Sequence, residues 1–303
     1  MRLSLWPQLR QPWSDVLDVA RHADATGWDG IYLADHFIGQ PGVAGGEEEP
    51  LLEITAVLAA LATATSRARL GTLVLGMTYR HPAVVANWAA SLDHVSGGRL
   101  LLGVGTGWQQ NEHDAYGIRL GPPGERIERF EEGVQAILGL LRSPRTTLQG
   151  RHYTLVDAVC EPQPLQDPLP LLIGARGDRM LRLVARYADE WNHWSAPDTF
   201  AARAAALDAA CEAQGRDPAT IARSTQAVVV VGERADDVEV EAAAHRAQGR
   251  PVVAGKPEQI AAAVAAWRDA GVDEVIVPDT ALGRGARRAD RLDALAEAIA
   301  PLR

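Results

Sequence analysis

Short apolar segments alternate with amphipathic segments along the whole chain. Several of these segments are nearly continuous hydrophobic runs, which is the pattern of a β-strand covered on both faces. The predicted strands span residues 3–6, 30–34, 70–75, 100–104, 169–173, 189–194, 224–231 and 274–277. The predicted helices span residues 13–26, 53–64, 82–95, 123–141, 178–187, 200–214, 257–270 and 289–298. Eight strands that each precede a helix are typical of a (β/α)8 TIM barrel.

The alternative fold is a doubly wound open sheet. A dinucleotide-binding sheet of that kind would carry a Gly-x-Gly-x-x-Gly turn directly after its first strand, and the residues that follow Trp6 lack it. At 303 residues the chain is long enough for one large core. We therefore predict that residues 1–303 form a single α/β domain, a TIM barrel with insertions in the loops that follow the strands.

Three segments interrupt the alternation. Residues 38–50 are rich in Gly and Glu and directly follow the second strand, which predicts a mobile lid. Residues 143–168 contain several prolines and indicate an insertion with a short hairpin before the fifth strand. Residues 234–251 indicate a further excursion that is partly helical. The apolar face of residues 54–61 belongs either to the core or to an interface between subunits.

Composition and charge exclude several classes of function. The net charge of −9 argues against a nucleic-acid or anionic-membrane surface, since no strong basic cluster offsets it. The two cysteines, Cys160 and Cys211, can form no disulfide framework and lie outside any metal-ligand spacing, so we expect no metal and a cytoplasmic location. The longest apolar run, residues 54–64, is too short to span a bilayer, and no export signal is visible.

The most informative stretch is the fourth strand and the turn after it. Gly103, Gly105 and Gly107 let a backbone or a flat ligand approach where the strand ends. Thr106, Trp108, Asn111 and Glu112 belong to the same strand end. The amide of Asn111 can read a ring edge because it offers both a donor and an acceptor. Trp108 is either part of a pocket wall or a packing residue that faces the lid.

Asp35 and His36 directly follow the second strand. A histidine at this place can exchange a proton with a substrate near neutral pH, while Asp35 either sets its tautomer or holds a backbone amide. The alternative interpretation is a simple turn with a solvated histidine. Beyond the third strand, Arg80 and His81 either serve the site or only anchor the turn before Pro82.

The turn of Gly174, Ala175, Arg176 and Gly177 follows the fifth strand and opens a helix at Asp178. Free amides and the positive end of the helix dipole favour a phosphate there. A plain tight turn is the alternative.

Several motifs together resemble one known superfamily. They are Gly-Trp-Asp-Gly-Ile-Tyr-Leu-Ala-Asp-His-Phe (27–37), Thr-Ser-Arg-Ala-Arg-Leu-Gly-Thr-Leu-Val (65–74), Tyr-Arg-His-Pro (79–82), Ser-Gly-Gly-Arg-Leu-Leu-Leu-Gly-Val-Gly-Thr-Gly-Trp (96–108), Ala-Asp-Glu-Trp-Asn (188–192) and Gly-Lys-Pro-Glu-Gln (255–259). Their order and spacing resemble the bacterial luciferase-like monooxygenases, and within them the coenzyme F420-dependent oxidoreductases.

The resemblance implies a barrel that holds a deazaflavin ring over its strand ends. It implies a bulge after Thr72 with a non-prolyl cis peptide at Leu73-Val74 under the ring. His36 would exchange the proton near the reactive ring carbon, Asn111 would bind the pyrimidine edge, and the 174–177 turn would hold the phosphate. The expected walls of the substrate pocket are Trp6, Tyr79, Trp108, Glu112 and Trp194.

The chain also departs from this pattern. Sugar-phosphate dehydrogenases of the branch have a glutamate where this chain has Trp108, and they bind substrate phosphate partly with lysines, whereas Lys256 is the single lysine here. We therefore predict hydride transfer between F420 and a small, partly apolar substrate, in a homodimer as is common in the family. The alternatives are an FMN-dependent monooxygenase and a flavin- or deazaflavin-binding protein without turnover.

Overall fold

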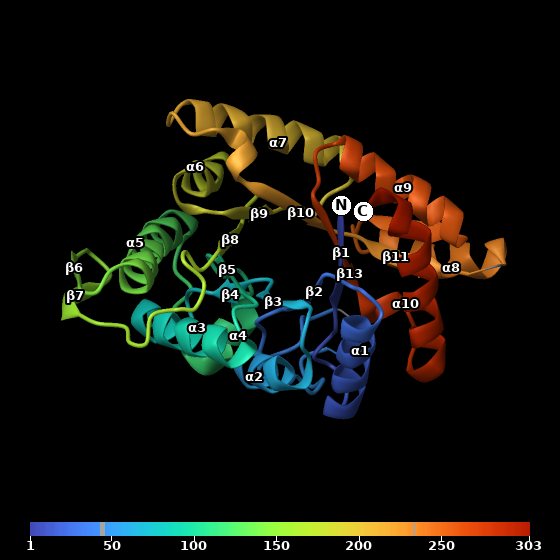
Figure 1. Ribbon diagram of the computed structural model, residues 1–303, viewed down its shortest axis with the longest axis horizontal. Helices are drawn as coiled ribbons and strands as arrows, with labels where there is room; N and C mark the ends of the chain where they lie inside the picture. Colours follow the sequence, from blue (N-terminus) through green and yellow to red (C-terminus); the bar gives the residue numbers. More distant parts are fainter. Residues whose placement is uncertain (43–45, 233) are drawn as a thin grey trace.

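The computed structural model describes residues 1–42, 46–232 and 234–303. Parallel strands close into a barrel in the order β3-β2-β1-β13-β10-β9-β8-β5, and β3 pairs with β5 to complete the ring (Figure 1). The strands are β1 (Arg2–Trp6), β2 (Gly30–Leu33), β3 (Arg69–Thr72), β5 (Leu100–Gly105), β8 (Leu171–Gly174), β9 (Glu190–Asn192), β10 (Ala222–Gln226) and β13 (Glu274–Pro278). The predicted (β/α)8 TIM barrel is confirmed.

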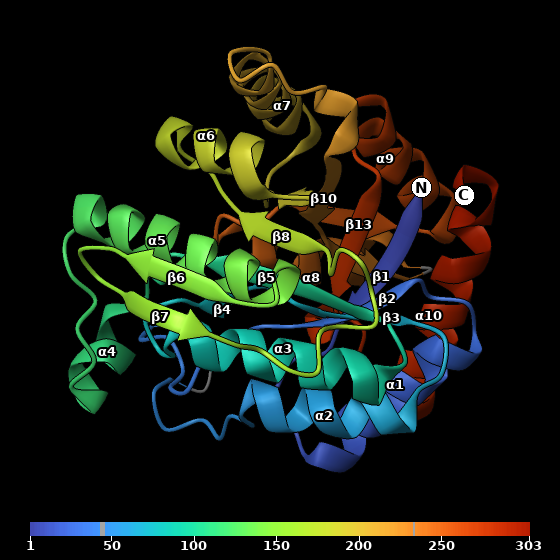
Figure 2. The same ribbon diagram turned by 60° about the vertical axis from the view of Figure 1, so that its left-hand side comes forward.

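Helices lie outside the ring of strands (Figures 1 and 2). They are α1 (Trp13–Ala25), α2 (Ile54–Ala64), α3 (Pro82–Ser96), α5 (Pro123–Arg142), α6 (Asp178–Tyr187), α7 (Pro197–Glu212), α9 (Pro257–Asp269) and α10 (Gly285–Ile299). The apolar face of α2, with Val57, Leu58 and Leu61, is buried and belongs to the core. No helix in the described ranges is long and apolar enough to cross a membrane.

The interior of the barrel is filled by side chains rather than open. Tyr32, Leu101, Leu172 and Ile276 form a buried cluster that Trp6 and Val74 complete at the edge. A methyl group on Gly71 would lie 2.3 Å from the ring of Tyr32, so the glycine makes room for that ring. A packed interior confines ligand binding to the ends of the strands.

Two predicted strands are interrupted. The predicted strand 70–75 divides into β3 and β4 (Leu75–Gly76) at a cis peptide between Leu73 and Val74, where the resemblance placed one. The predicted strand 224–231 divides at Ala227, whose amide makes a hydrogen bond to Ile276 before the chain leaves the barrel. After it, β11 (Val228–Val231) pairs with β12 (Val252–Gly255) in a separate sheet. The composition changes at the same place, from Ser-Thr-Gln at the end of β10 to the four valines of β11.

The insertions lie where the sequence places them. Strands β6 (Thr146–Gln149) and β7 (Thr154–Ala158) form the predicted antiparallel hairpin. Helix α8 (Ala235–Arg246) makes the 234–251 segment partly helical, as predicted. Helix α4 (Gln110–Tyr116) was not predicted. The predicted lid includes residues 43–45, which lie outside the described residues. Short 3-10 turns complete the chain at Pro218–Thr220, Asp279–Ala281 and Ala300–Leu302.

Candidate functional site

A cavity opens at the carboxyl ends of the barrel strands. Trp6 from the end of β1, His36 after β2, Trp108 after β5 and Trp194 after β9 all line it. The rings of Trp6 and Trp194 meet edge to face at 5.7 Å, and the His36 ring lies 5.5 Å from that of Trp108. Trp108 is 57% exposed at the mouth. Four of the residues singled out in the sequence therefore converge on one aromatic cavity.

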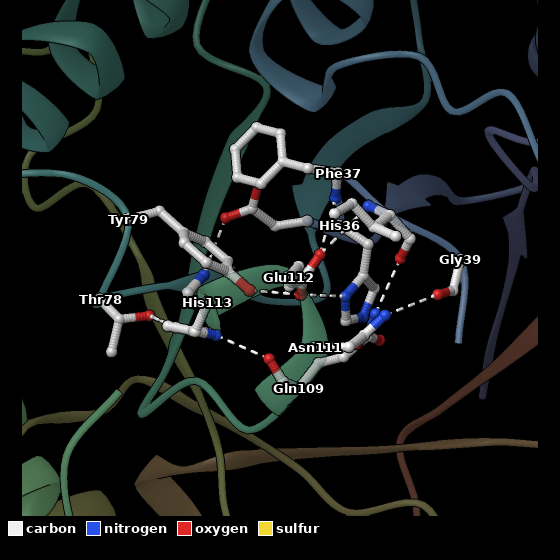
Figure 3. A network of polar contacts seen from close by, with 12 residues as sticks. His36, Phe37, Gly39, Thr78, Tyr79, Gln109, Asn111, Glu112 and His113 are labelled. Carbon is white, nitrogen blue, oxygen red and sulfur yellow. Dashed lines mark hydrogen bonds and ion pairs between the residues drawn. The ribbon is translucent and has the colours of Figure 1, made fainter. Parts of the chain in front are cut away.

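Glu112 lies beneath His36 and not in the pocket wall, where the sequence analysis put it. Its side chain is fully buried on α4, and its Oε1 lies 2.9 Å from Nδ1 of His36 (Figure 3). Its Oε2 accepts hydrogen bonds from the amides of Phe37 at 2.9 Å and Ile38 at 3.3 Å. The hydroxyl of Tyr79 also donates to Oε1. All four groups around this carboxylate point donors at it.

This arrangement fixes the protonation of the cluster. Burial raises the pKa of Glu112, but the hydrogen bonds from His36, Tyr79 and Phe37 outweigh it and hold that pKa below its usual value. Burial and the contact with Glu112 raise the pKa of Tyr79, which keeps it a donor. Since an ionised carboxylate only accepts, Nδ1 of His36 carries a proton, and Nε2 is the nitrogen left for a ligand.

Asp35 holds a backbone amide and does not set the tautomer of His36. Its Oδ2 accepts from the Gly76 amide at 2.9 Å, and both of its oxygens accept from Arg80 at 2.7 and 3.1 Å. Arg80 also donates to Glu53 at 2.7 Å, at the start of α2. Nδ1 of His81 accepts from an amide at the start of α3. Asp35, Arg80 and His81 thus anchor the turns around the site.

Asn111 points away from the cavity, toward the loop after β2. Its Nδ2 donates to the carbonyl of Gly39 at 3.1 Å and to Glu47 at 2.7 Å (Figure 3). Nε2 of Gln109 donates to the carbonyl of Ile38 at 2.7 Å. In this arrangement the amide of Asn111 ties down the loop, and it would have to turn to read a ring edge.

His113 supports the cluster, and sequence reasoning missed it. The ring is buried; Nδ1 donates to the Gln109 carbonyl at 2.7 Å, and the Thr78 hydroxyl donates to Nε2 at 2.7 Å. It stacks on Tyr79 with 4.7 Å between ring centres. The signal available in the sequence was Gly117, which ends α4 in a left-handed conformation with φ 66° and so marks a helix through this polar stretch.

Two glycines at strand ends leave room for the side chain of Val74 and shape the surface around it. A methyl group on Gly105 would lie 2.6 Å from the Val74 side chain, and one on Gly174 would lie 3.4 Å from it. Val74 itself is half-buried. Thr72 is fully buried, and its hydroxyl donates to the Gly103 carbonyl at 2.6 Å, so it ties two strands together and faces no ligand. Thr106 is half-buried beside this surface.

The turn after β8 presents an open helix end. Gly177 caps α6 with no side-chain hydrogen bond to the helix, and a methyl group built on it would meet no atom within 4 Å. Ala175 is held by two backbone contacts, its amide to Asn192 and its carbonyl to the Trp191 ring. Arg176 is exposed. An open helix end with free amides is what a phosphate requires.

Comparison with known proteins identifies the family. The profile described as luciferase-like monooxygenase matches residues 1–252. The chain therefore belongs to the luciferase-like monooxygenase family.

Three individual proteins illustrate the likeness. An F420-dependent glucose-6-phosphate dehydrogenase from Microbacterium testaceum is 35% identical over 186 residues, which are 61% of this chain and 54% of that protein. An F420-dependent secondary alcohol dehydrogenase in complex with an F420-acetone adduct superimposes with a TM-score of 0.86 at 19% identity, over 100% of both chains. A monooxygenase from Streptomyces bottropensis superimposes with a TM-score of 0.84 at 21% identity, over 100% of this chain and 99% of that one.

The curated relatives and the solved structures support different conclusions. The chain spans about half the length of the curated relatives it matches. The solved structures share the barrel at identities too low to transfer a reaction. The choice of reaction therefore rests on the site itself.

Proposed function

We propose that the protein is a coenzyme F420-dependent oxidoreductase that transfers a hydride between the deazaflavin and a small organic substrate. The observation that carries the proposal is His36, whose ring lines the aromatic cavity while Glu112 holds its Nδ1 at 2.9 Å. The relatives named as F420-dependent enzymes support the choice of cofactor. Proton exchange beside a hydride acceptor is the task for which such a histidine is suited.

The residues present fit this cofactor. The half-buried side chain of Val74, for which Gly105 and Gly174 leave room, would support the flat ring. The amides of the 174–177 turn and the open end of α6 would hold the phosphate. When bound, the deazaflavin supplies a ring carbon that accepts or gives the hydride. Val74 lies between β3 and β4, and the 174–177 turn begins at the end of β8.

His36 would move the proton that accompanies the hydride. With Nδ1 committed to Glu112, Nε2 faces the cavity and gives a proton to, or takes one from, a substrate oxygen. The carboxylate of Glu112 stabilises the ring when it is doubly protonated, and the amides of Phe37 and Ile38 hold that carboxylate in place. Trp6 and Trp194 would cover the reacting atoms and exclude water.

One experiment tests the choice of cofactor. F420 and FMN are added separately to the purified protein under matched salt, and quenching of the ring fluorescence is followed. We expect F420 to bind more tightly. Equal or tighter binding of FMN would contradict the proposal. It would favour an FMN-dependent monooxygenase, a candidate that the structural likeness to a monooxygenase supports. Consumption of oxygen by the reduced complex would identify that enzyme. F420 binding without redox chemistry over a broad substrate panel would indicate a binding protein.

We infer in addition a homodimer in the cytoplasm. Val84 and Val95 expose apolar side chains on α3, at 60% and 51% of their surface. Both cysteines are buried free thiols, which suits a reducing compartment. Light scattering on the purified protein should give twice the mass of the chain, and a monomer over the whole concentration range would overturn the dimer.

A further inference from the structure

A second, polar cleft adjoins the aromatic cavity. Gln8, Arg10, Arg250 and Thr280 line both spaces. Away from the tryptophans, the cleft is lined further by Gln11, Glu49, His245, Gln248, Asp279, Gly283, Arg284 and Arg288. We call it the arginine cleft. Because the arginine cleft adjoins the aromatic cavity, a molecule bound in the cavity can extend one end into the cleft.

The two carboxylates of the arginine cleft are already neutralised. Oε2 of Glu49 lies 3.0 Å from Nη1 of Arg10. Oδ2 of Asp279 lies 2.8 Å from Nη1 of Arg288, and both of these side chains are nearly fully buried. Neither carboxylate is therefore left to balance a further positive charge.

Nη1 of Arg284 lies 3.8 Å from Oδ2 of Asp15, so Arg250 is the arginine of the cleft that has no ion pair within the described residues. Within the described residues its guanidinium makes no hydrogen bond or ion pair, and its contact is with the face of Trp194, 6.0 Å from the ring centre. The side chain is half-buried. Burial and the positive charge of Arg10 lower the pKa of Arg250, which shows that its surroundings oppose the charge. A half-buried guanidinium without a counter-ion, at the border of a cavity, is in place to pair with a ligand.

His245 adds a second unpartnered group. Its Nδ1 is buried and has no hydrogen-bond partner in the parts of the chain described. Burial lowers the pKa of His245, and the charge of Arg250 adds to the effect. A neutral ring at this place offers either a donor or an acceptor beside the guanidinium, without adding charge.

We propose that Arg250 binds an oxyanion group of the substrate, whose apolar part packs among Trp6, Trp108 and Trp194. The substrate is accordingly an amphiphilic acid, with a carboxylate or a phosphate at one end. The guanidinium offers two parallel N–H donors to such a group, and the ring of Trp194 holds it flat. The assignment of this acid as the substrate rests on the proposed function, whereas the binding site itself rests on Arg250 and the two adjoining spaces.

The probes are benzoate, benzyl alcohol and inorganic phosphate, titrated separately into the cofactor-free protein with tryptophan fluorescence as the readout. Benzoate and benzyl alcohol share the ring and differ in charge. We expect benzoate to bind about tenfold or more tightly than benzyl alcohol, and Arg250→Gln to remove that preference. Arg246→Gln is the matched control, because Arg246 is exposed on α8, pairs with Glu239 and lines neither space.

The phosphate arm distinguishes the two sources of an oxyanion. Binding of phosphate that depends on Arg250 and exceeds that of benzoate supports a phosphate-bearing substrate, and the reverse order supports a carboxylate. Benzoate binding no tighter than that of benzyl alcohol, together with no binding of phosphate, would overturn the site. So would an equal loss in Arg246→Gln. Thermal unfolding of both variants confirms that they are folded.

The outcome is separable from that of the proposed function. We expect Arg250→Gln to bind F420 within about twofold of the wild type, because Arg250 lies outside the surface around Val74 and the 174–177 turn. Failure of F420 to bind the wild type would contradict the proposed function and leave the oxyanion site standing. Absence of both the benzoate preference and phosphate binding in the wild type would contradict the oxyanion site alone.

Discussion

Nδ1 of His36 lies 2.9 Å from Oε1 of Glu112, although 76 positions separate the two residues along the chain. His36 follows β2, and Glu112 lies on the short helix α4 after β5. The barrel joins them because β3 pairs with both β2 and β5. Glu112 thereby acts as a positioning residue: it contacts the histidine and leaves the cavity to other side chains.

Replacement of Glu112 by glutamine tests this role. The amide keeps the shape but loses the negative charge and replaces one acceptor oxygen by a donor, so it no longer stabilises the doubly protonated ring of His36. We expect Glu112→Gln to lower the rate of hydride transfer by about tenfold or more, with F420 affinity within about twofold of the wild type. Single-turnover kinetics at saturating cofactor measures the first quantity and fluorescence titration the second. A large loss of affinity at an unchanged rate would show a structural role instead.

Stability should fall as the pH falls below the ordinary range of histidine, and His193 provides part of the reason. Burial, with the charges of Arg176 and Arg203, lowers the pKa of His193 to about 4. Its pKa in the unfolded chain is about 6.5. Between these pH values His193 binds a proton in the unfolded chain but not in the native protein. The free energy of unfolding therefore decreases as the pH goes from about 6.5 to 4.

The test compares the wild type with His193→Gln, which cannot titrate. Urea unfolding at pH 7 and at pH 5 gives the free energy of unfolding of each protein. We expect the wild type to lose more of it than the variant does between these two values. Equal losses would mean that His193 is already protonated in the native protein at pH 5.

Replacement of Gly177 tests the phosphate turn. The structure leaves open space where a side chain would project, so Gly177→Val should fold and yet occupy the place of the phosphate. We expect cofactor affinity to fall by about tenfold or more. Gly124→Val, in the first turn of α5, is the control, since a methyl group there meets only the end of the Arg179 side chain at 3.8 Å. Unchanged affinity in a folded Gly177→Val would place the phosphate elsewhere.

The barrel could be predicted from the sequence because most strands are short apolar runs that alternate with amphipathic helices. The division of the predicted strand 224–231 was missed because the sequence does not say which strand each part pairs with, although the composition changes from Ala-Arg-Ser-Thr-Gln in β10 to four valines in β11. Helix α4 was missed because its seven residues are mostly polar and give no apolar period. The cis peptide at Leu73-Val74 came from the resemblance and is confirmed.

The sequence predicted the aromatic residues of the site better than the carboxylates, because the position of a carboxylate depends on its partners. Aromatic residues at strand ends, such as Trp6 and Trp194, follow from the topology alone. Whether a carboxylate is buried depends on hydrogen-bond donors from distant segments of the chain. The sequence analysis therefore placed Glu112 in the pocket wall, whereas the structure buries it against Tyr79 and the amides after His36. Of the two roles that the sequence offered for Asp35, the structure shows the contact with a backbone amide, while Glu112 contacts Nδ1 of His36. The sequence could not foresee that Arg80 would occupy both oxygens of Asp35.

The central claim is that His36 exchanges the proton that accompanies hydride transfer. General acid-base help is worth roughly 10²–10⁴ in rate, so His36→Ala should slow hydride transfer by that factor while leaving the fold and most F420 affinity intact. Single-turnover hydride transfer at saturating F420, measured from pH 6 to 8, removes binding from the comparison. A loss of two to four orders of magnitude is what we predict, and a rate within about twofold of the wild type across that range would contradict the role assigned to His36.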